Sequence, residues 1–130
     1  MSARPRTIQI YLPNGDPRGI RVAELTTSIV RVVEVPRSML PEFKQMPEAE
    51  QVALYFLFGS GEAQDSMVYI GQSGCVGKRL DTHNSNKDFW NKALVVVSMT
   101  NNLTQTHARY LEWSSIKAAM EVGRYAVENG

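Results

Sequence analysis

Three side chains suited to proton transfer or anion binding lie close together in VYIGQSGCVGKRLDTH, residues 68–83. Tyr69 ends an apolar run, Arg79 follows ten residues later, and His83 comes four residues after that. A phenol and an imidazole can take part in proton transfer, and a guanidinium binds phosphate or carboxylate through paired hydrogen bonds. The segment predicts a strand, a glycine-containing turn, and a helix that carries Arg79 and His83 one turn apart.

A carboxylate, Glu112, lies on the inward face of a second predicted helix. Thr104 is a favourable N-cap residue, and the helix is expected to run from there to Val122. Glu112 falls among the positions that should meet a sheet, where an unpaired charge is costly. Glu112 is therefore expected to form a salt bridge, to reach solvent at the edge of the stripe, or to bind a metal ion. The sheet-facing stripe is predicted to be Ala108, Leu111, Ser115, Ala119 and Val122.

Taken singly, each of these residues also has an ordinary structural explanation. Tyr55 and Tyr69 are aromatic residues, which are common in strands and can be there for packing alone. A histidine on an apolar helix face is more often a hydrogen-bonded structural residue than a catalyst, and Arg79 alone would be a solvated surface charge. The functional interpretation depends on their coincidence, because Tyr69, the helix with Arg79 and His83, and the helix with Glu112 are separate elements. The topology could bring all four residues to one end of a small sheet.

Other reactive side chains are expected to have simpler roles. Lys78 is predicted at the surface, and Cys75 has no local activator apart from a nearby helix start. His107 is interpreted as a surface or capping residue. Trp90 and Trp113 are predicted to pack in the core or at its edge and not to stack on bases.

The elements that must position these groups follow from the local patterns. Residues 1–48 predict an N-terminal β-hairpin-like extension with a third strand and a helical turn, and residues 49–130 predict a strand–strand–helix–strand–helix domain. This order predicts an α/β (α+β) fold: a small central, mainly antiparallel three-stranded sheet flanked by helices. The expected strands are 7–12, 19–22, 29–35, 51–58, 67–70 and 93–99, the helices are 76–84 and 104–122, and 124–130 is left as strand or helix.

The composition limits the class of protein to which the chain can belong. The chain has 130 residues, 43% hydrophobic and 21% charged, as in ordinary soluble proteins. Its single cysteine excludes an internal disulfide, and no apolar run reaches the ~20 residues of a membrane helix. No secretion signal is recognised, so a cytoplasmic location and no membrane partner are expected. The net charge of +1 means that affinity for phosphate must come from a local cluster. The oligomeric state stays open.

The residues resemble the GIY-YIG nuclease superfamily over about 51–129. In that pattern a Gly-Ile-Tyr strand precedes a Tyr-Ile-Gly strand, an arginine follows about ten residues later with a His or Tyr one turn on, and a glutamate lies on a later helix. Here Ala53-Leu54-Tyr55 matches the first motif and Tyr69-Ile70-Gly71 the second. Arg79 and His83 have the expected spacing, and the glutamate matches Glu112 in ARYLE. Ala53 and Leu54 depart mildly from the first motif.

The resemblance implies a DNA endonuclease that hydrolyses phosphodiester bonds with one Mg²⁺ (or Mn²⁺) held by Glu112. Tyr55, Tyr69, Arg79 and His83 would be the other catalytic residues, with either tyrosine acting on the water. Gly71, Lys78 and Asn129 would contact substrate. Since the superfamily includes repair endonucleases, homing endonucleases and restriction enzymes, DNA is the implied partner and DNA repair or restriction the implied setting.

A narrower likeness is to a prokaryotic branch of stand-alone GIY-YIG domain proteins. It rests on NGDPRGIRVAEL, NKDFWNKALVVVS, NNLTQTHARYLE and GRYAVENG. Members usually continue into further C-terminal sequence, so the chain is expected to be part of such a protein or a short version. Two alternatives stay open: a non-catalytic nucleic-acid-binding or protein-interaction module, and a structural subunit that uses residues 1–48 as its contact.

Overall fold

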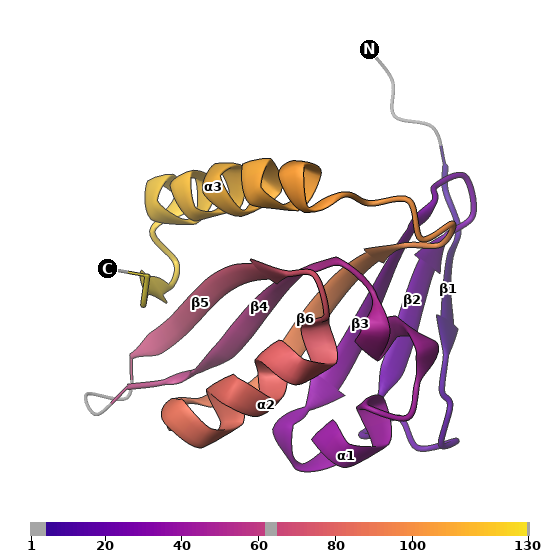
Figure 1. The fold of residues 1–130 in the computed structure, drawn as a ribbon, viewed down its shortest axis with the longest axis horizontal. Helices are drawn as coiled ribbons and strands as arrows, with labels where there is room; N and C mark the ends of the chain where they lie inside the picture. Colours follow the sequence, from indigo (N-terminus) through magenta and orange to yellow (C-terminus); the bar gives the residue numbers. More distant parts are fainter. Residues whose placement is uncertain (1–4, 62–64, 130) are drawn as a thin grey trace.

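The computed structural model describes residues 5–61 and 65–129, and within them seven strands form one sheet (Figure 1). The strand order is β1-β2-β3-β6-β4-β5-β7, in which only the β5–β7 pair is parallel. The strands are β1 (Ile8–Tyr11), β2 (Arg21–Leu25), β3 (Val30–Pro36), β4 (Ala53–Ser60), β5 (Ser66–Ser73), β6 (Trp90–Ser98) and β7 (Ala126–Val127). The helices are η1 (Arg37–Met39), α1 (Leu40–Phe43), η2 (Pro47–Glu50), α2 (Val76–Asn86) and α3 (Gln105–Val122).

The mixed α/β character is as predicted, but the sheet is wider than the three strands expected. The predicted strands β5, β4 and β6 lie side by side, and β3 then pairs antiparallel with β6 along its whole length, from Val30 opposite Ser98 to Pro36 opposite Lys92. The β-branched run of β3 predicts a strand but does not specify its partner. Pairing with β6 satisfies the backbone of β3 and brings the N-terminal strands into the same sheet as the candidate site.

Alternation along the strands divides the core between two faces. On one face Tyr55 and Leu57 pack with Val76 and Leu80 of α2. On the other, Leu54 and its neighbours pack beneath α3. Figure 1 shows the same arrangement, with α1 and α2 along one face and α3 along the other. Residues of β4 and β5 that point toward α2 are therefore the ones that can meet Arg79 and His83.

Helix α3 begins and ends as its sequence indicates, but its buried stripe differs from the prediction. The Thr104 hydroxyl accepts a hydrogen bond from the His107 N–H at 3.2 Å, and Gly123 closes the helix with a positive φ of 72°. Leu111 and Val122, predicted to face the sheet, are exposed. The helix lies over β4 and β5, so only one side of it meets the sheet. Ala108 is buried there, while Ile116 and Ala119 pack beside the sheet.

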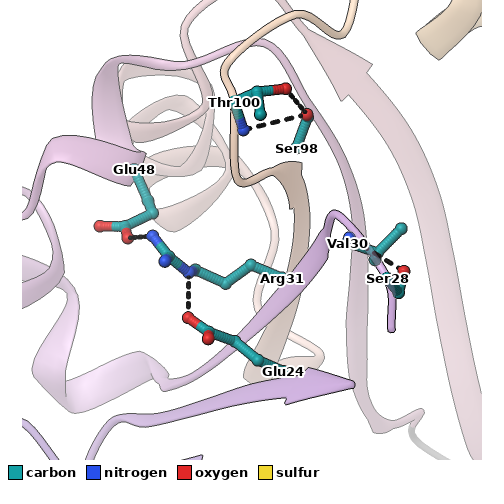
Figure 2. A network of polar contacts seen from close by, with 7 residues as sticks. All are labelled: Glu24, Ser28, Val30, Arg31, Glu48, Ser98 and Thr100. Carbon is teal, nitrogen blue, oxygen red and sulfur yellow. Dashed lines mark hydrogen bonds and ion pairs between the residues drawn. The ribbon is translucent and has the colours of Figure 1, made fainter. Parts of the chain in front are cut away.

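An arginine with two carboxylates joins the N-terminal strands to the segment before β4. Arg31 of β3 lies between Glu24 of β2 and Glu48 of η2, as Figure 2 shows. Its Nε is 2.7 Å from Glu24 Oε1, and its Nη1 is 2.8 Å from Glu48 Oε2. Helix η2 packs against α2, with Ala49 close to Gly77. The two ion pairs of Arg31 therefore connect β2 and β3 to the segment that contacts α2.

None of the helices in 5–61 and 65–129 combines the length and the apolar character needed to cross a membrane.

Candidate active site

Four of the five predicted catalytic residues meet on the α2 side of the sheet. The Tyr55 hydroxyl of β4 is 2.7 Å from His83 Nε2 of α2. The ring of Tyr69, from β5, lies 4.9 Å from the His83 ring and 6.3 Å from the Tyr55 ring, centroid to centroid. Arg79 is one helical turn before His83, and the nearby phenols of Tyr55 and Tyr69 raise the pKa of its guanidinium. The spacing seen in the sequence thus becomes a three-dimensional cluster.

Gly71 makes room for this cluster. It lies opposite Tyr55 in the β4–β5 register. A Cβ at position 71 would lie 2.5 Å from Tyr55 Cζ and closer still to the hydroxyl oxygen. Any side chain there would displace the phenol that bonds His83. The packing of Tyr55 therefore explains why position 71 is a glycine. The predicted contact of Gly71 with substrate stays a prediction.

Burial makes both Tyr55 and His83 uncharged at neutral pH. Burial raises the pKa of Tyr55 to about 12, against an opposing effect of the hydrogen bond to Arg79. Burial, with the charges of Arg79 and Lys87, lowers the pKa of His83 to about 4. The charge of Arg79 lowers the pKa of Tyr55, but the effect of burial is larger. Its hydrogen bond to His83 joins a neutral phenol to a neutral imidazole.

Arg79 keeps its charge and faces solvent. Hydrogen bonding to Tyr55 is the largest of the effects that raise the pKa of the guanidinium above its usual range, and Tyr69 adds to it. The residue as a whole is exposed. An exposed guanidinium near two phenols has donors available for an anion, and planar Arg donors suit phosphate oxygens.

Two cationic residues not foreseen from the sequence support the cluster. Lys87 Nζ lies 4.3 Å from the centroid of the Tyr69 ring. Arg37 donates from Nε to Asn84 Oδ1 at 2.8 Å and stacks 4.6 Å from the Trp90 ring centroid. The Trp90 indole N–H in turn donates to the His83 carbonyl at 3.3 Å. Lys87 is recognisable as one turn beyond His83, whereas no local signal links Arg37 to residues about fifty positions later.

Glu112 approaches the cluster from the other face of the sheet. It lies on α3, is half-buried, and its charge contributes the smallest of the effects that raise the pKa of Tyr55. The start of α3 adjoins the turn after β5, because a Cβ on Gly74 would lie 2.8 Å from Gln105 Nε2. The start of the helix that carries Glu112 therefore lies near the end of the sheet at which Gly71 and Tyr55 pair.

Glu112 is the one carboxylate among the predicted site residues, and it could hold a metal ion. Within the described part of the chain no Lys, Arg or His forms an ion pair with Glu112, although the carboxylate is half-buried. The same residues include no group of three or more His, Cys, Asp or Glu side chains arranged to hold a metal. One carboxylate with waters and substrate oxygens is a common way to bind Mg²⁺, so Glu112 is the residue that would hold the ion.

The other predicted substrate residues have separate positions. Lys78 is exposed on α2 next to Arg79. Asn129 pairs with the backbone of Ile70: its Oδ1 accepts from the Ile70 N–H at 2.9 Å, and its Nδ2 donates to the Ile70 carbonyl at 2.6 Å. The Asn129 amide thus continues the β5–β7 ladder with its side chain. Both of its polar atoms are engaged there, on the strand that carries Tyr69.

The residues that were predicted to have simple structural roles differ in how the structure places them. Trp90 is buried in the core as predicted, and His107 is exposed next to the cap of α3. Cys75 precedes α2, with its Sγ 3.7 Å from the Ala49 carbonyl oxygen. Trp113 was predicted to pack, but its side chain is 60% exposed on α3. That prediction is wrong because α3 turns position 113 away from the sheet.

The cluster contains a buried neutral Tyr–His pair, a solvent-facing guanidinium, and a half-buried carboxylate with no ion-pair partner among the described residues. Comparisons of the chain with protein-family models, with curated proteins and with solved structures found no match.

Proposed function

We propose that this protein is a metal-dependent endonuclease that hydrolyses DNA phosphodiester bonds at the cluster of Tyr55, Tyr69, Arg79, His83 and Glu112. The observation that carries the proposal is the exposed Arg79, which lies on α2 one turn before His83, the residue that is hydrogen-bonded to Tyr55. Phosphoryl transfer depends chiefly on positioning and on neutralising charge, and a fixed guanidinium supplies both.

The roles follow from burial. Arg79 binds the scissile phosphate and stabilises charge on its oxygens as the reaction proceeds. Tyr69 orients the attacking water, since Tyr55 is fully buried, has a raised pKa, and is engaged with His83. Tyr55 and His83 hold Arg79 and Tyr69 in place. The water oxygen forms the new bond to phosphorus and loses a proton to solvent, one ester P–O bond breaks, and the leaving oxygen takes up a proton from solvent.

Glu112 would hold the metal ion. Bound Mg²⁺ (or Mn²⁺) supplies Lewis-acid stabilisation of charge on the phosphate oxygens. The carboxylate fits that role through its chemistry and its half-burial without an ion-pair partner in the described residues.

The test is cleavage of single-stranded, duplex and branched DNA by the purified protein in Mg²⁺ and in EDTA. We expect Arg79→Ala and Glu112→Gln each to reduce the rate by about 10²–10³, because each removes a preorganised charge at the reacting phosphate. Both residues are at or near the surface, so circular dichroism and the thermal midpoint should stay close to wild type. Arg18→Ala, an exposed arginine in the β1–β2 connection, is the matched control and should cleave normally. Wild-type rates in both site variants would contradict the proposal.

The second candidate function is a non-catalytic nucleic-acid-binding or protein-interaction module. The Tyr55–His83 pair favours it, since a buried neutral phenol and imidazole that satisfy each other need no substrate. Binding without metal-dependent cleavage by the wild-type chain would support this function instead.

A further inference from the structure

Helix α3 presents two large aromatic rings to solvent. The side chains of Tyr110 and Trp113 are 64% and 60% exposed, and their ring centroids lie 6.2 Å apart. Both residues are turned away from Ala108 and Ala119, which face the sheet. Aromatic side chains usually bury most of their area, so a neighbouring exposed pair indicates a surface that something covers.

Two basic residues of α3 lie near these rings. Lys117 Nζ lies 5.4 Å from the centroid of the Trp113 ring, and Arg109 is exposed just before Tyr110. No carboxylate in the described residues forms an ion pair with either cation. The acid nearest in sequence to Lys117 is Glu121, one turn further along. We call Arg109, Tyr110, Trp113 and Lys117 the α3 aromatic face.

We propose that the α3 aromatic face binds an unpaired, single-stranded stretch of nucleic acid by stacking bases on Tyr110 and Trp113. The proposal rests on the proposed function and specifies its substrate. Aromatic rings beside basic side chains are how proteins hold single strands, since every base has a π-face and every linkage a negative charge. The bases of an intact duplex are stacked inside it and do not offer those faces, so the preference is for unpaired segments.

The α3 aromatic face is on the helix that also carries Glu112, the carboxylate assigned to the metal. Successive residues of a helix point in different directions, so the rings and the carboxylate lie on different sides of α3. Charge complementarity also favours nucleic acid, because no carboxylate in residues 5–61 and 65–129 forms an ion pair with Arg109 or Lys117, so both can pair with phosphates. The exposed apolar residues nearer the end of the helix, Met120 and Val122, lie beyond the cations and are not needed for stacking.

The experiment measures binding without metal, so that cleavage does not interfere. A fluorescein-labelled oligothymidylate and a duplex of equal length are titrated in EDTA and followed by anisotropy. We expect Tyr110→Ala and Trp113→Ala each to weaken single-strand binding about tenfold and to leave duplex binding within about twofold. The control Met120→Ala removes a side chain 57% exposed on the same helix and should bind like wild type.

Tryptophan fluorescence gives a second readout. The chain has two tryptophans, and Trp90 is buried, so quenching by unlabelled single strands reports on Trp113. We expect quenching in wild type and in Arg79→Ala, which should bind without cleaving, and none in Trp113→Ala.

Some outcomes would overturn the proposal without touching the nuclease assignment. One is single-strand binding by Tyr110→Ala and Trp113→Ala as tight as wild type, with cleavage still dependent on Arg79. Another is self-association of the wild-type protein that Trp113→Ala abolishes while DNA binding is unchanged, since the face would then be a protein–protein surface. Conversely, wild-type cleavage rates in both Arg79→Ala and Glu112→Gln would defeat the nuclease site whatever the α3 face binds.

Discussion

At the scale of single residues, the Tyr55–His83 hydrogen bond is the centre of the candidate site. Only 4% of the His83 side chain is exposed, and its imidazole lies near two cations, so its charged form is strongly disfavoured. The pair therefore has a structural role that does not depend on catalysis. Arg79 and Glu112, which are less enclosed, are the residues whose charges are available to a substrate or an ion.

The pKa of His83 predicts how the free energy of unfolding changes with pH. The folded-state pKa of about 4 lies below the usual 6.5, so the unfolded chain binds the extra proton between these values. Stability should therefore fall as the pH decreases from 6.5 toward 4, by on the order of 2 kcal/mol from this residue. Urea denaturation at several pH values measures it.

His83→Gln is the control for that prediction. Glutamine is uncharged at every pH and can still bond the Tyr55 hydroxyl, so the difference in stability between pH 6.5 and pH 4 should be smaller in the variant. An identical pH dependence in both proteins would show that His83 is not the titrating group.

At the scale of elements, the β4–β5 pair and the start of α2 position the site. Gly71 opposes Tyr55 across the pair, and the following turn leads into α2 at Val76, whose N–H donates to the Gln51 carbonyl just before β4. Asn129 secures the outer side of β5 through Ile70. The two tyrosines are thus fixed to a rigid ladder, and the helix that carries Arg79 and His83 is tied to its end.

Gly71→Ala should destabilise the fold by about 2–3 kcal/mol, because the new methyl group would overlap the Tyr55 ring. Gly123→Ala is a useful comparison: Gly123 has a φ of +72° with open space around it, so only the backbone strain of about 1 kcal/mol applies. Chemical denaturation of both variants gives the two values.

A double variant isolates the clash. Adding Tyr55→Leu to Gly71→Ala should cost less than the sum of the two single changes, since the smaller side chain leaves room for the methyl group. Additive costs would mean that the glycine is needed for something other than the phenol.

At the scale of the whole molecule, the N-terminal strands belong to the structure that holds the site. Val33 and Val35 share one buried cluster with Tyr55 and Leu80, and the Glu24–Arg31–Glu48 contacts link two N-terminal strands to η2 (Figure 2). Arg37, directly after β3, reaches the end of α2. Residues before position 49 therefore help to set where His83 lies.

Arg37→Ala tests this connection. It removes hydrogen bonds to Asn84, Asp88 and Trp90 and the stacking on the Trp90 ring, so we expect a loss of on the order of 2 kcal/mol in unfolding free energy. The His83 resonances should also shift in an NMR spectrum. Arg37→Lys should recover little, because an ammonium lacks the planar set of donors. Unchanged stability and unchanged His83 signals would contradict the link.

Local patterns in the sequence were enough to predict the type and order of most elements. Alternation and β-branched runs mark the strands, and Thr104 marks the start of α3, because periodicity and caps depend on near neighbours. The ten-residue step from Tyr69 to Arg79 and the turn to His83 also follow from one strand–turn–helix segment. That is why most of the candidate site was foreseeable.

Tertiary structure decided what depends on distant partners. The pairing of β3 with β6 widened the sheet, and the placement of α3 over β4 and β5 exposed Leu111, Val122 and Trp113. Burial then set the opposite pKa shifts of Tyr55 and His83. Strand partners, the rotation of a helix and the degree of burial result from packing across the whole chain, and no short stretch of sequence contains that information.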